Sequence, residues 1–370
     1  MVGAANVLVD PYGLFPEANL KPLRPYESRR GSRIAKAADL ARGGFRSAIF
    51  GTSRSEVGFD PRHPKITPQP AYNAALAGTS MAELGRVYAF ADERNALELA
   101  LFGLDFILFN EHGGFGDDYE ASLFALDRDG LLAAAPLLLS QRSLDATLES
   151  LGRAARGSAT DYTEQGRRAR KIQDVRSNTL ARCAFALRQI FTSPALYAGY
   201  SLSGARLSEM REIVAARGSA GLRTVIVVTP AHALLLETIR ASGLWGEFER
   251  FKRALAEFDA LGAVVYDFTG YNEYTTEPLP IDEPSREMRW HWEVSHFRKE
   301  LGDLVLDLAL GEPADPDALA PTSFGQRLTP ETIEPHLARI RTEREAWLPG
   351  AAEQLAWFRG VLNLPDPAED

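Results

Sequence analysis

A serine, a carboxylate and a histidine occur along this chain in an order that suits nucleophilic catalysis. Ser53 lies in a Gly-Thr-Ser-Arg stretch directly after the apolar run at residues 45–50, and His296 stands near the other end, three residues after Glu293. A carboxylate can orient an imidazole and stabilise its cation while the other ring nitrogen faces a serine hydroxyl. The sequence therefore predicts Ser53 as nucleophile, His296 as base and Glu293, or else Asp267, as the group that orients the base.

Further residues are predicted beside this serine because they follow other apolar runs or lie in the late loop. Asn73 and Gly78 end a second short extended run, and the Ser53 and Gly78 amides with the Asn73 side chain are candidates for an oxyanion hole. Asp105 and Asp267 are candidate site carboxylates. Four side chains are predicted to contact substrate: Arg54, Trp290, Trp292 and Tyr271.

The apolar pattern predicts the elements that must position these residues. Strands are expected at 45–50, 70–78, 99–109, 222–230 and 263–267, separated by helical segments that include 81–93, 231–244 and 297–310. Strands that alternate with helices favour an α/β fold with a doubly wound parallel sheet, in three layers. Such sheets bind ligands beyond the carboxyl ends of their strands, where the candidate residues fall.

Two long segments depart from this alternation. Residues 117–205 carry apolar residues at helical spacing and are expected to form a helical insertion that covers the site as a lid. Residues 311–370 begin with a Pro/Asp/Ala-rich stretch and continue as a C-terminal helical extension, with Thr329 expected to cap its helix. The whole chain, 1–370, is otherwise expected to be one domain.

Composition excludes several functions. The formal net charge of −9 disfavours nucleic-acid binding, since such a surface repels phosphates. The single cysteine, Cys183, rules out an internal disulfide and a thiolate metal cluster, and it is expected to be buried. The histidines show no zinc-motif spacing and no phosphate-binding loop is present, so neither a metal nor another cofactor is expected. No stretch reaches the roughly 18 apolar residues of a membrane span.

The motifs together resemble those of the SGNH (GDSL-type) hydrolase superfamily. The first block, Gly-Asp-Ser, would correspond to residues 51–53, the Asn and Gly of the second block to Asn73 and Gly78, and the Asp-x-x-His of the last block to residues 293–296. The Gly-Thr-Ser-Arg form is similar to a bacterial envelope branch related to proteins that acylate alginate and teichoic acids. Members of that branch commonly carry an N-terminal membrane anchor ahead of a stretch like Val-Asp-Pro-Tyr-Gly, which residues 9–13 match. The resemblance spans residues 9–345, apart from the insertion.

One departure from the superfamily pattern bears on the chemistry. The third block, Gly-x-Asn, reads Gly-Leu-Asp at residues 103–105, and an ionised Asp105 cannot donate a hydrogen bond to an oxyanion. Either Asp105 is protonated, or the other donors act without it, or the reaction is not acyl transfer. With a protonated Asp105, the substitution Asp105→Asn is expected to keep or raise esterase activity.

The resemblance implies a serine esterase or acyltransferase that acts on an acylated bacterial polysaccharide, on the periplasmic or extracellular side of a membrane. Two other functions stay open. One is a glycosidase on the same fold that uses two carboxylates, drawn from Asp105, Glu111, Asp267, Glu273 and Glu293. The other is a glycan-binding relative without catalysis.

Overall fold

The computed structural model describes residues 2–125, 135–169, 178–311 and 324–365. The protein is a mixed α/β structure built around one six-stranded sheet, in the order β2-β1-β3-β4-β5-β6. The strands are β1 (Ser47–Gly51), β2 (Ala71–Asn73), β3 (Leu99–Leu104), β4 (Arg223–Val228), β5 (Ala263–Asp267) and β6 (Gln326–Arg327). All neighbouring pairs are parallel except β5 and β6, which are antiparallel.

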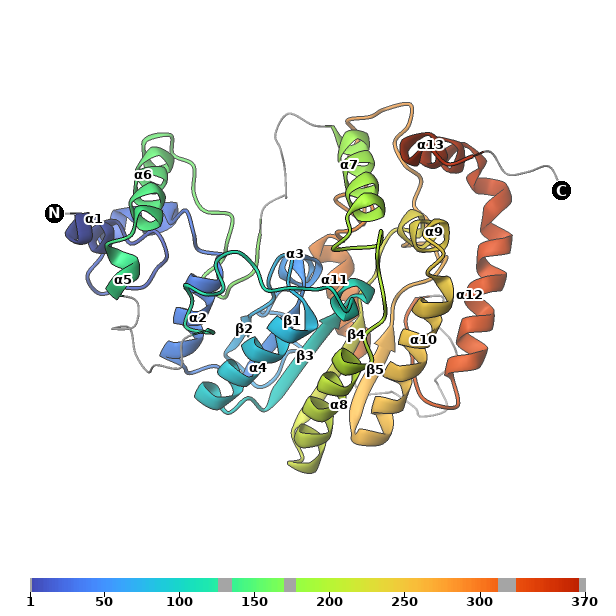
Figure 1. The fold of residues 1–370 in the computed structure, drawn as a ribbon, viewed down its shortest axis with the longest axis horizontal. Coiled ribbons are helices and arrows are strands. Elements are labelled where there is room, and N and C mark those ends of the chain that lie inside the picture. Colours follow the sequence, from blue (N-terminus) through green and yellow to red (C-terminus); the bar gives the residue numbers. More distant parts are fainter. Residues whose placement is uncertain (1, 126–134, 170–177, 312–323, 366–370) are drawn as a thin grey trace.

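Helices cover both faces of this sheet (Figure 1). The α-helices of the α/β unit and C-terminal part are α2 (Arg33–Arg42), α3 (Ser53–Gly58), α4 (Met81–Asn95), α8 (Gly204–Ser219), α9 (Ala233–Ala241), α10 (Trp245–Ala256), α11 (Lys299–Leu310), α12 (Ile333–Trp347) and α13 (Ala352–Leu362). Alternate strand residues point to opposite faces: Phe50 and Phe102 belong to the core with α4 and α8, whereas Ile49 and Leu101 belong to the core with α11. The strands are buried on both faces, as is usual in parallel sheets.

The order of the first five strands, 2-1-3-4-5, is that of a doubly wound sheet whose direction of winding reverses between β1 and β3. A crevice forms at this reversal, outside the carboxyl ends of the strands. The residues that follow β1 and β3 are Thr52 and Asp105, so the topology places the candidate serine and its surroundings at the ligand-binding edge.

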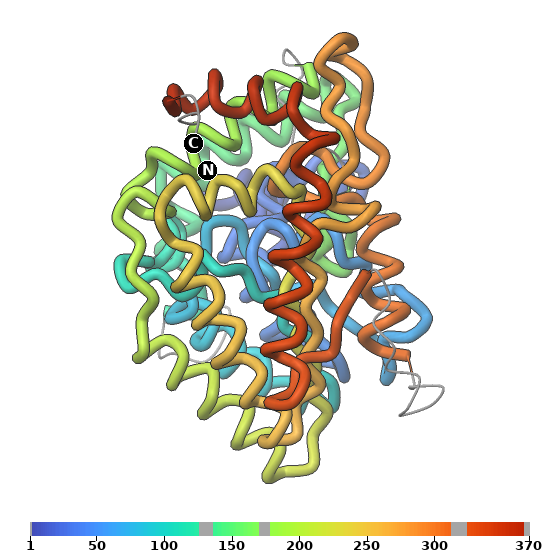
Figure 2. Tube along the Cα trace, turned by 90° about the vertical axis from the view of Figure 1, so that its right-hand side faces the viewer, coloured from blue at the N-terminus to red at the C-terminus, as the bar shows by residue number. Residues whose placement is uncertain are grey.

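Two smaller helical groups flank the sheet (Figure 1). Beside the β2 edge, α1 (Val2–Val9), α5 (Ala135–Leu138) and α6 (Gln141–Ala155) pack together with the 3₁₀ segment Lys21–Tyr26. On the other side, α7 (Thr179–Thr192) packs against α9 and α13. Figure 2 shows α12 running along that side and continuing into α13. Segment 117–205 is thus not one helical unit, because α6 belongs to one group and α7 to the other.

Several elements differ from the sequence-based expectation. The apolar run 99–109 is not one strand: β3 ends at Leu104 and a 3₁₀ turn, Phe106–Phe109, follows. Helix α12 begins at Ile333 after Thr332, so Thr329 is not its cap; Thr329 instead takes part in the turn before it. The pattern gave no indication of α1 or β6, whereas α13 falls within the helical extension expected at 311–370. The linker expected at 311–323 lies almost entirely outside the described residues. None of the described helices is long and apolar enough to cross a membrane.

Candidate active site

The turn after β1 explains the Gly-Thr-Ser-Arg stretch. Gly51 has φ +152, and a Cβ at this position would lie 2.5 Å from the Gly103 carbonyl oxygen, so only glycine fits between the two strands. Thr52 caps α3 by accepting a hydrogen bond from the Arg54 amide at 3.2 Å. Ser53 is therefore the first residue of a helix that starts directly at the strand end, and its side chain is only partly buried.

Ser53, His296 and Glu293 form a hydrogen-bonded series. The Ser53 Oγ lies 2.8 Å from the His296 Nε2, and the His296 Nδ1 is hydrogen-bonded to a Glu293 carboxylate oxygen. These contacts fit the tautomer in which Nδ1 carries the proton and donates to Glu293, leaving Nε2 to accept from the serine hydroxyl. The predicted proximity of Ser53 and His296 is confirmed, over 243 positions of sequence.

The carboxylate of Glu293 is held by its own loop. Its two oxygens accept from the amides of Ser295 and His296, each at 2.9 Å. Burial opposes ionisation, but the His296 ring and these amides outweigh it and lower the pKa of Glu293. Glu293 is therefore ionised near neutral pH and can stabilise a cationic His296.

The loop that carries Glu293 and His296 is closed on itself and fixed at its base. The Trp292 amide donates to the His296 carbonyl at 2.8 Å, and the Arg298 amide donates to the Trp290 carbonyl at 2.7 Å. Glu277 accepts from the Trp290 amide and pairs with His291 Nδ1 at 2.7 Å. The histidine base thus sits on a braced hairpin-like loop.

The insertion helix α7 also supports this loop. Cys183 is buried in one cluster with Val294 and Met288, as expected for a structural thiol, and burial raises its pKa. Val294 accepts from the His232 amide at 3.1 Å through its carbonyl. His232 is buried as the cap of α9, and burial together with nearby His291 lowers its pKa to about 4, so this ring is neutral and structural.

Asp105 lies in a buried network and does not occupy an oxyanion hole. One oxygen pairs with Arg54 at 3.0 Å and also accepts from the Thr229 hydroxyl, and the other accepts from the Thr52 hydroxyl. Both oxygens of the carboxyl group are thus engaged by protein groups, so the alternative in which Asp105 donates to an oxyanion is wrong. Arg54 is engaged by protein groups on two sides, because its Nε also donates to Ser295 Oγ at 3.1 Å.

The structure separates the proposed oxyanion-hole residues. The Asn73 amide nitrogen donates to the carbonyls of Ser55 and Phe59, at 3.0 and 2.9 Å, and its oxygen accepts from the Ala75 amide. Asn73 is fully buried and holds α3 in place, so its assignment to the oxyanion hole is wrong. Gly78 is exposed with φ +65, and across the described residues its amide and that of Ser53 donate to no protein acceptor. These two amides remain available to an oxyanion.

Asp267 and Tyr271 do not belong to the site. Asp267 is buried against Lys252 at 2.8 Å and His336 at 2.7 Å; burial opposes its ionisation, but the Lys252 charge and the contact with His336 outweigh burial and lower its pKa far below the ordinary value. It therefore cannot orient His296. Tyr271 donates to Glu237 at 2.5 Å and packs against Trp347 in the core, so its predicted substrate contact is wrong.

The two tryptophans flank the loop of the base and are half-buried. The Arg289 guanidinium lies 4.5 Å from the centre of the Trp290 ring, and Arg298 lies 4.0 Å from that of Trp292. Each indole thus has a cation on one face, which favours a supporting role through cation–π attraction. Their contact with substrate stays a prediction.

Three residues of this arrangement were not assigned a role from the sequence. Ser295 and Thr229 bind the Arg54–Asp105 pair, and Glu277 fixes the loop of the base. Ser295 directly precedes His296 and Thr229 directly follows β4, so their positions in the sequence could have indicated that they lie near the site. The position of Glu277 gave no such indication, because it lies in an irregular segment between two elements.

The described residues contain no group of three or more His, Cys, Asp or Glu side chains that could hold a metal ion. The arrangement at the carboxyl edge of the sheet consists of a serine, a histidine and a carboxylate, and within the described residues the backbone amide of the serine itself donates to no protein acceptor. In comparisons with known proteins, no family model and no curated protein matches this chain.

Proposed function

We propose that the protein is a serine esterase or acyltransferase that acts on an acylated bacterial polysaccharide. The observation that carries the proposal is the 2.8 Å contact between Ser53 Oγ and His296 Nε2, with Glu293 bonded to the other ring nitrogen. A serine that only forms a surface turn does not need a histidine, oriented by a buried carboxylate, beside its hydroxyl. A serine nucleophile needs such a base to accept its proton.

The proposed reaction has two steps. The Ser53 oxygen attacks the acyl carbonyl while His296 accepts the serine proton, and the Ser53 and Gly78 amides stabilise the oxyanion. His296 then returns the proton to the sugar oxygen, which leaves, and an acyl-serine remains. Water or a second hydroxyl attacks this ester with His296 as base, and Ser53 is regenerated.

The polysaccharide, the SGNH three-layer fold and an extracytoplasmic location are the finer parts of this proposal. The strand order 2-1-3-4-5 with the serine after β1 and the histidine in the last loop supports the fold. The resemblance of residues 51–54 and 9–13 to the envelope branch supports the substrate class and a site outside the cytoplasmic membrane.

Three of the five carboxylates proposed for the glycosidase alternative are engaged by protein groups, and the other two, Glu111 and Glu273, are exposed. Asp105 is occupied by Arg54, Asp267 by Lys252, and Glu293 by His296. Glycoside cleavage needs two carboxyl groups that flank the scissile bond, one of which is free to donate a proton.

Labelling with a fluorophosphonate probe tests the proposal. The wild-type protein is expected to be labelled, and Ser53→Ala and His296→Ala are expected to lose labelling while keeping their folded circular-dichroism spectrum. Ser55→Ala is the matched control, since its hydroxyl contacts the Gly103 carbonyl at 3.4 Å and is not part of the series with His296. Labelling that persists in Ser53→Ala, or that is absent from the folded wild-type protein, would contradict the proposal.

A further inference from the structure

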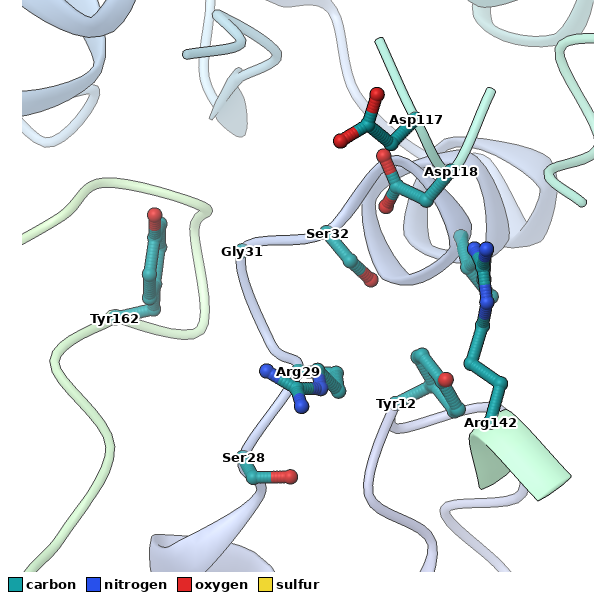
Figure 3. A pocket seen from close by; sticks show the side chains of 10 residues that line it. Tyr12, Ser28, Arg29, Gly31, Ser32, Asp117, Asp118, Arg142 and Tyr162 are labelled. Atoms are coloured by element: carbon teal, nitrogen blue, oxygen red, sulfur yellow. The ribbon is translucent and has the colours of Figure 1, made fainter. Parts of the chain in front are cut away.

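A cavity of about 560 Å³ is lined by residues of α2 and α6 and of the loops around them, and Ser53 is not among its lining residues (Figure 3). Its walls come from segments far apart in the sequence: the N-terminal turn, the segment before α2, the loop at 117–118, the start of α6 and the loop at 162. Two tyrosines and four charged side chains line it: Tyr12, Tyr162, Arg29, Arg142, Asp117 and Asp118. Figure 3 shows Tyr12 and Tyr162 on opposite sides of the segment that contains Gly31 and Ser32.

Tyr12 reaches this cavity through a fixed turn formed by residues 9–13. The Asp10 carboxylate accepts from the amides of Leu14 and Phe15, each at 2.7 Å. The Pro11 carbonyl accepts from the Arg29 amide at 2.9 Å, which ties the turn to the segment before α2. The turn at residues 9–13, which resembles a stretch of the anchored branch, therefore places Tyr12 in the wall of this cavity.

The position of the Tyr162 ring is also fixed by its contacts. A Cβ on Gly31 would lie 1.9 Å from the Tyr162 ring, so the ring rests directly on the glycine backbone. Lys36 lies 5.7 Å from the ring centre. Burial and the neighbouring Glu56 raise the pKa of Tyr162, so it is a neutral phenol at every physiological pH.

The charges around the cavity are balanced. Arg29 pairs with Glu149 at 2.9 Å, and Asp118 pairs with Arg33 at 3.3 Å. Arg142 and Asp117 contribute one charge of each sign and are both exposed. A strongly charged ligand would meet a like charge here. A ligand with many hydroxyl groups finds both donors and acceptors, and the half-buried Tyr162 offers apolar ring surface, whereas Tyr12 is almost fully buried.

Two contacts connect the wall of the cavity to elements of the candidate active site. Tyr162 neighbours Glu56, which belongs to the same helix as Ser53. Arg33, directly after the Ser32 of the cavity wall, donates to the carbonyl of Ala77, the residue before Gly78, at 3.1 Å. Tyr162 also lines a second cavity of about 460 Å³. Two adjoining cavities suit successive units of a chain better than one small molecule.

We propose that this cavity binds a neutral segment of the glycan chain whose acylated unit reaches Ser53, so that the protein prefers polymer over short esters. The inference rests on the proposed function for its link to Ser53, whereas glycan binding itself can be measured without turnover. Aromatic rings with a few placed polar groups in a cavity of this size are sufficient for specific binding.

Binding is measured on the Ser53→Ala protein with an array of neutral glucan, mannan, galactan and N-acetylglucosamine oligosaccharides of two to eight units. We expect binding that strengthens with chain length and that weakens about tenfold in Asp117→Ala and in Arg142→Ala. The matched control is Asp145→Ala, an exposed residue on the same helix as Arg142 that does not line the cavity. It should bind like its parent.

Two results would overturn the inference: no neutral oligosaccharide binds, or the variants bind as tightly as the control. In the active protein the Asp117→Ala and Arg142→Ala substitutions should raise KM for acylated polymer about tenfold with kcat unchanged. Fluorophosphonate labelling of the wild-type protein is scored separately. Labelling without neutral-glycan binding rejects this inference alone, and glycan binding without labelling rejects the proposed function alone.

Discussion

Arg54, the residue after the candidate nucleophile, donates from its Nε to the hydroxyl of Ser295, the residue before the candidate base, at 3.1 Å. The same guanidinium pairs with Asp105 at the end of β3. One side chain thus joins the turn that carries Ser53, the loop that carries His296 and the centre of the sheet. This contact fixes the relative position of two residues that lie 243 positions apart.

Arg54→Lys tests this positioning. Lysine keeps the charge beside Asp105 but lacks the planar fork that serves two acceptors at once. We expect kcat for an acyl ester to fall about tenfold with little change in KM, since alignment and not ground-state binding is lost. Arg62→Lys is the matched control, because Arg62 is exposed and pairs with Asp60, outside the network of Arg54. A kcat equal to that of the control would contradict a positioning role.

Asp105→Asn is expected to destabilise the protein, whereas the superfamily pattern predicted only that esterase activity would be kept or raised. The substitution leaves the buried Arg54 charge without its counter-ion, and breaking such a pair typically costs about 3–5 kcal/mol. Urea unfolding followed by circular dichroism measures the loss. Arg54→Met combined with Asp105→Asn should restore part of it, and the double-mutant cycle gives the coupling. If Asp105→Asn unfolds at the same urea concentration as the wild-type protein, the Arg54–Asp105 pair does not contribute to stability.

Glu293→Gln tests whether catalysis needs His296 to be oriented by a carboxylate, because the substitution keeps His296 itself in place. The amide cannot stabilise a cationic His296 and can present its NH₂ group to Nδ1, which disfavours the productive tautomer. We expect kcat to fall about 10³- to 10⁴-fold, the scale of the corresponding change in other triads. Glu283→Gln, an exposed change in the segment leading to the same loop, serves as the control. Retention of more than a tenth of the activity would show that Glu293 is dispensable.

Acid should destabilise the fold through Asp267. Lys252 and His336 hold its pKa below the ordinary value of about 4, so the ionised form is favoured in the folded state. The resulting stability is present above about pH 4 and is lost as the pH falls through and below that value. Urea midpoints measured from pH 7 to pH 3 should decline, and the decline should be shallower in Asp267→Asn than in the wild-type protein. If the urea midpoints of the two proteins decline equally with pH, groups other than Asp267 cause the sensitivity to acid.

The sequence by itself determined the class of the fold and the three residues of the series. Strands at 47–51, 99–104, 223–228 and 263–267 were readable because each is an apolar run bounded by glycine, proline or a charged residue. Ser53 and His296 were readable because a strand-end serine and a carboxylate three residues before a histidine are local patterns. A parallel sheet then brings its strand ends together whatever the distance in sequence.

Only the tertiary structure decided the roles of the other candidates. Asn73, Asp105 and Asp267 all follow or end strands, yet each is held by partners that no local pattern reveals: the carbonyls of α3, the Arg54 guanidinium and the Lys252 ammonium. A buried polar group needs such partners, and long-range packing alone chooses them. The placement of Tyr12 and Tyr162 around one cavity was set in the same way, because it depends on how the N-terminal turn and a distant loop pack against α2.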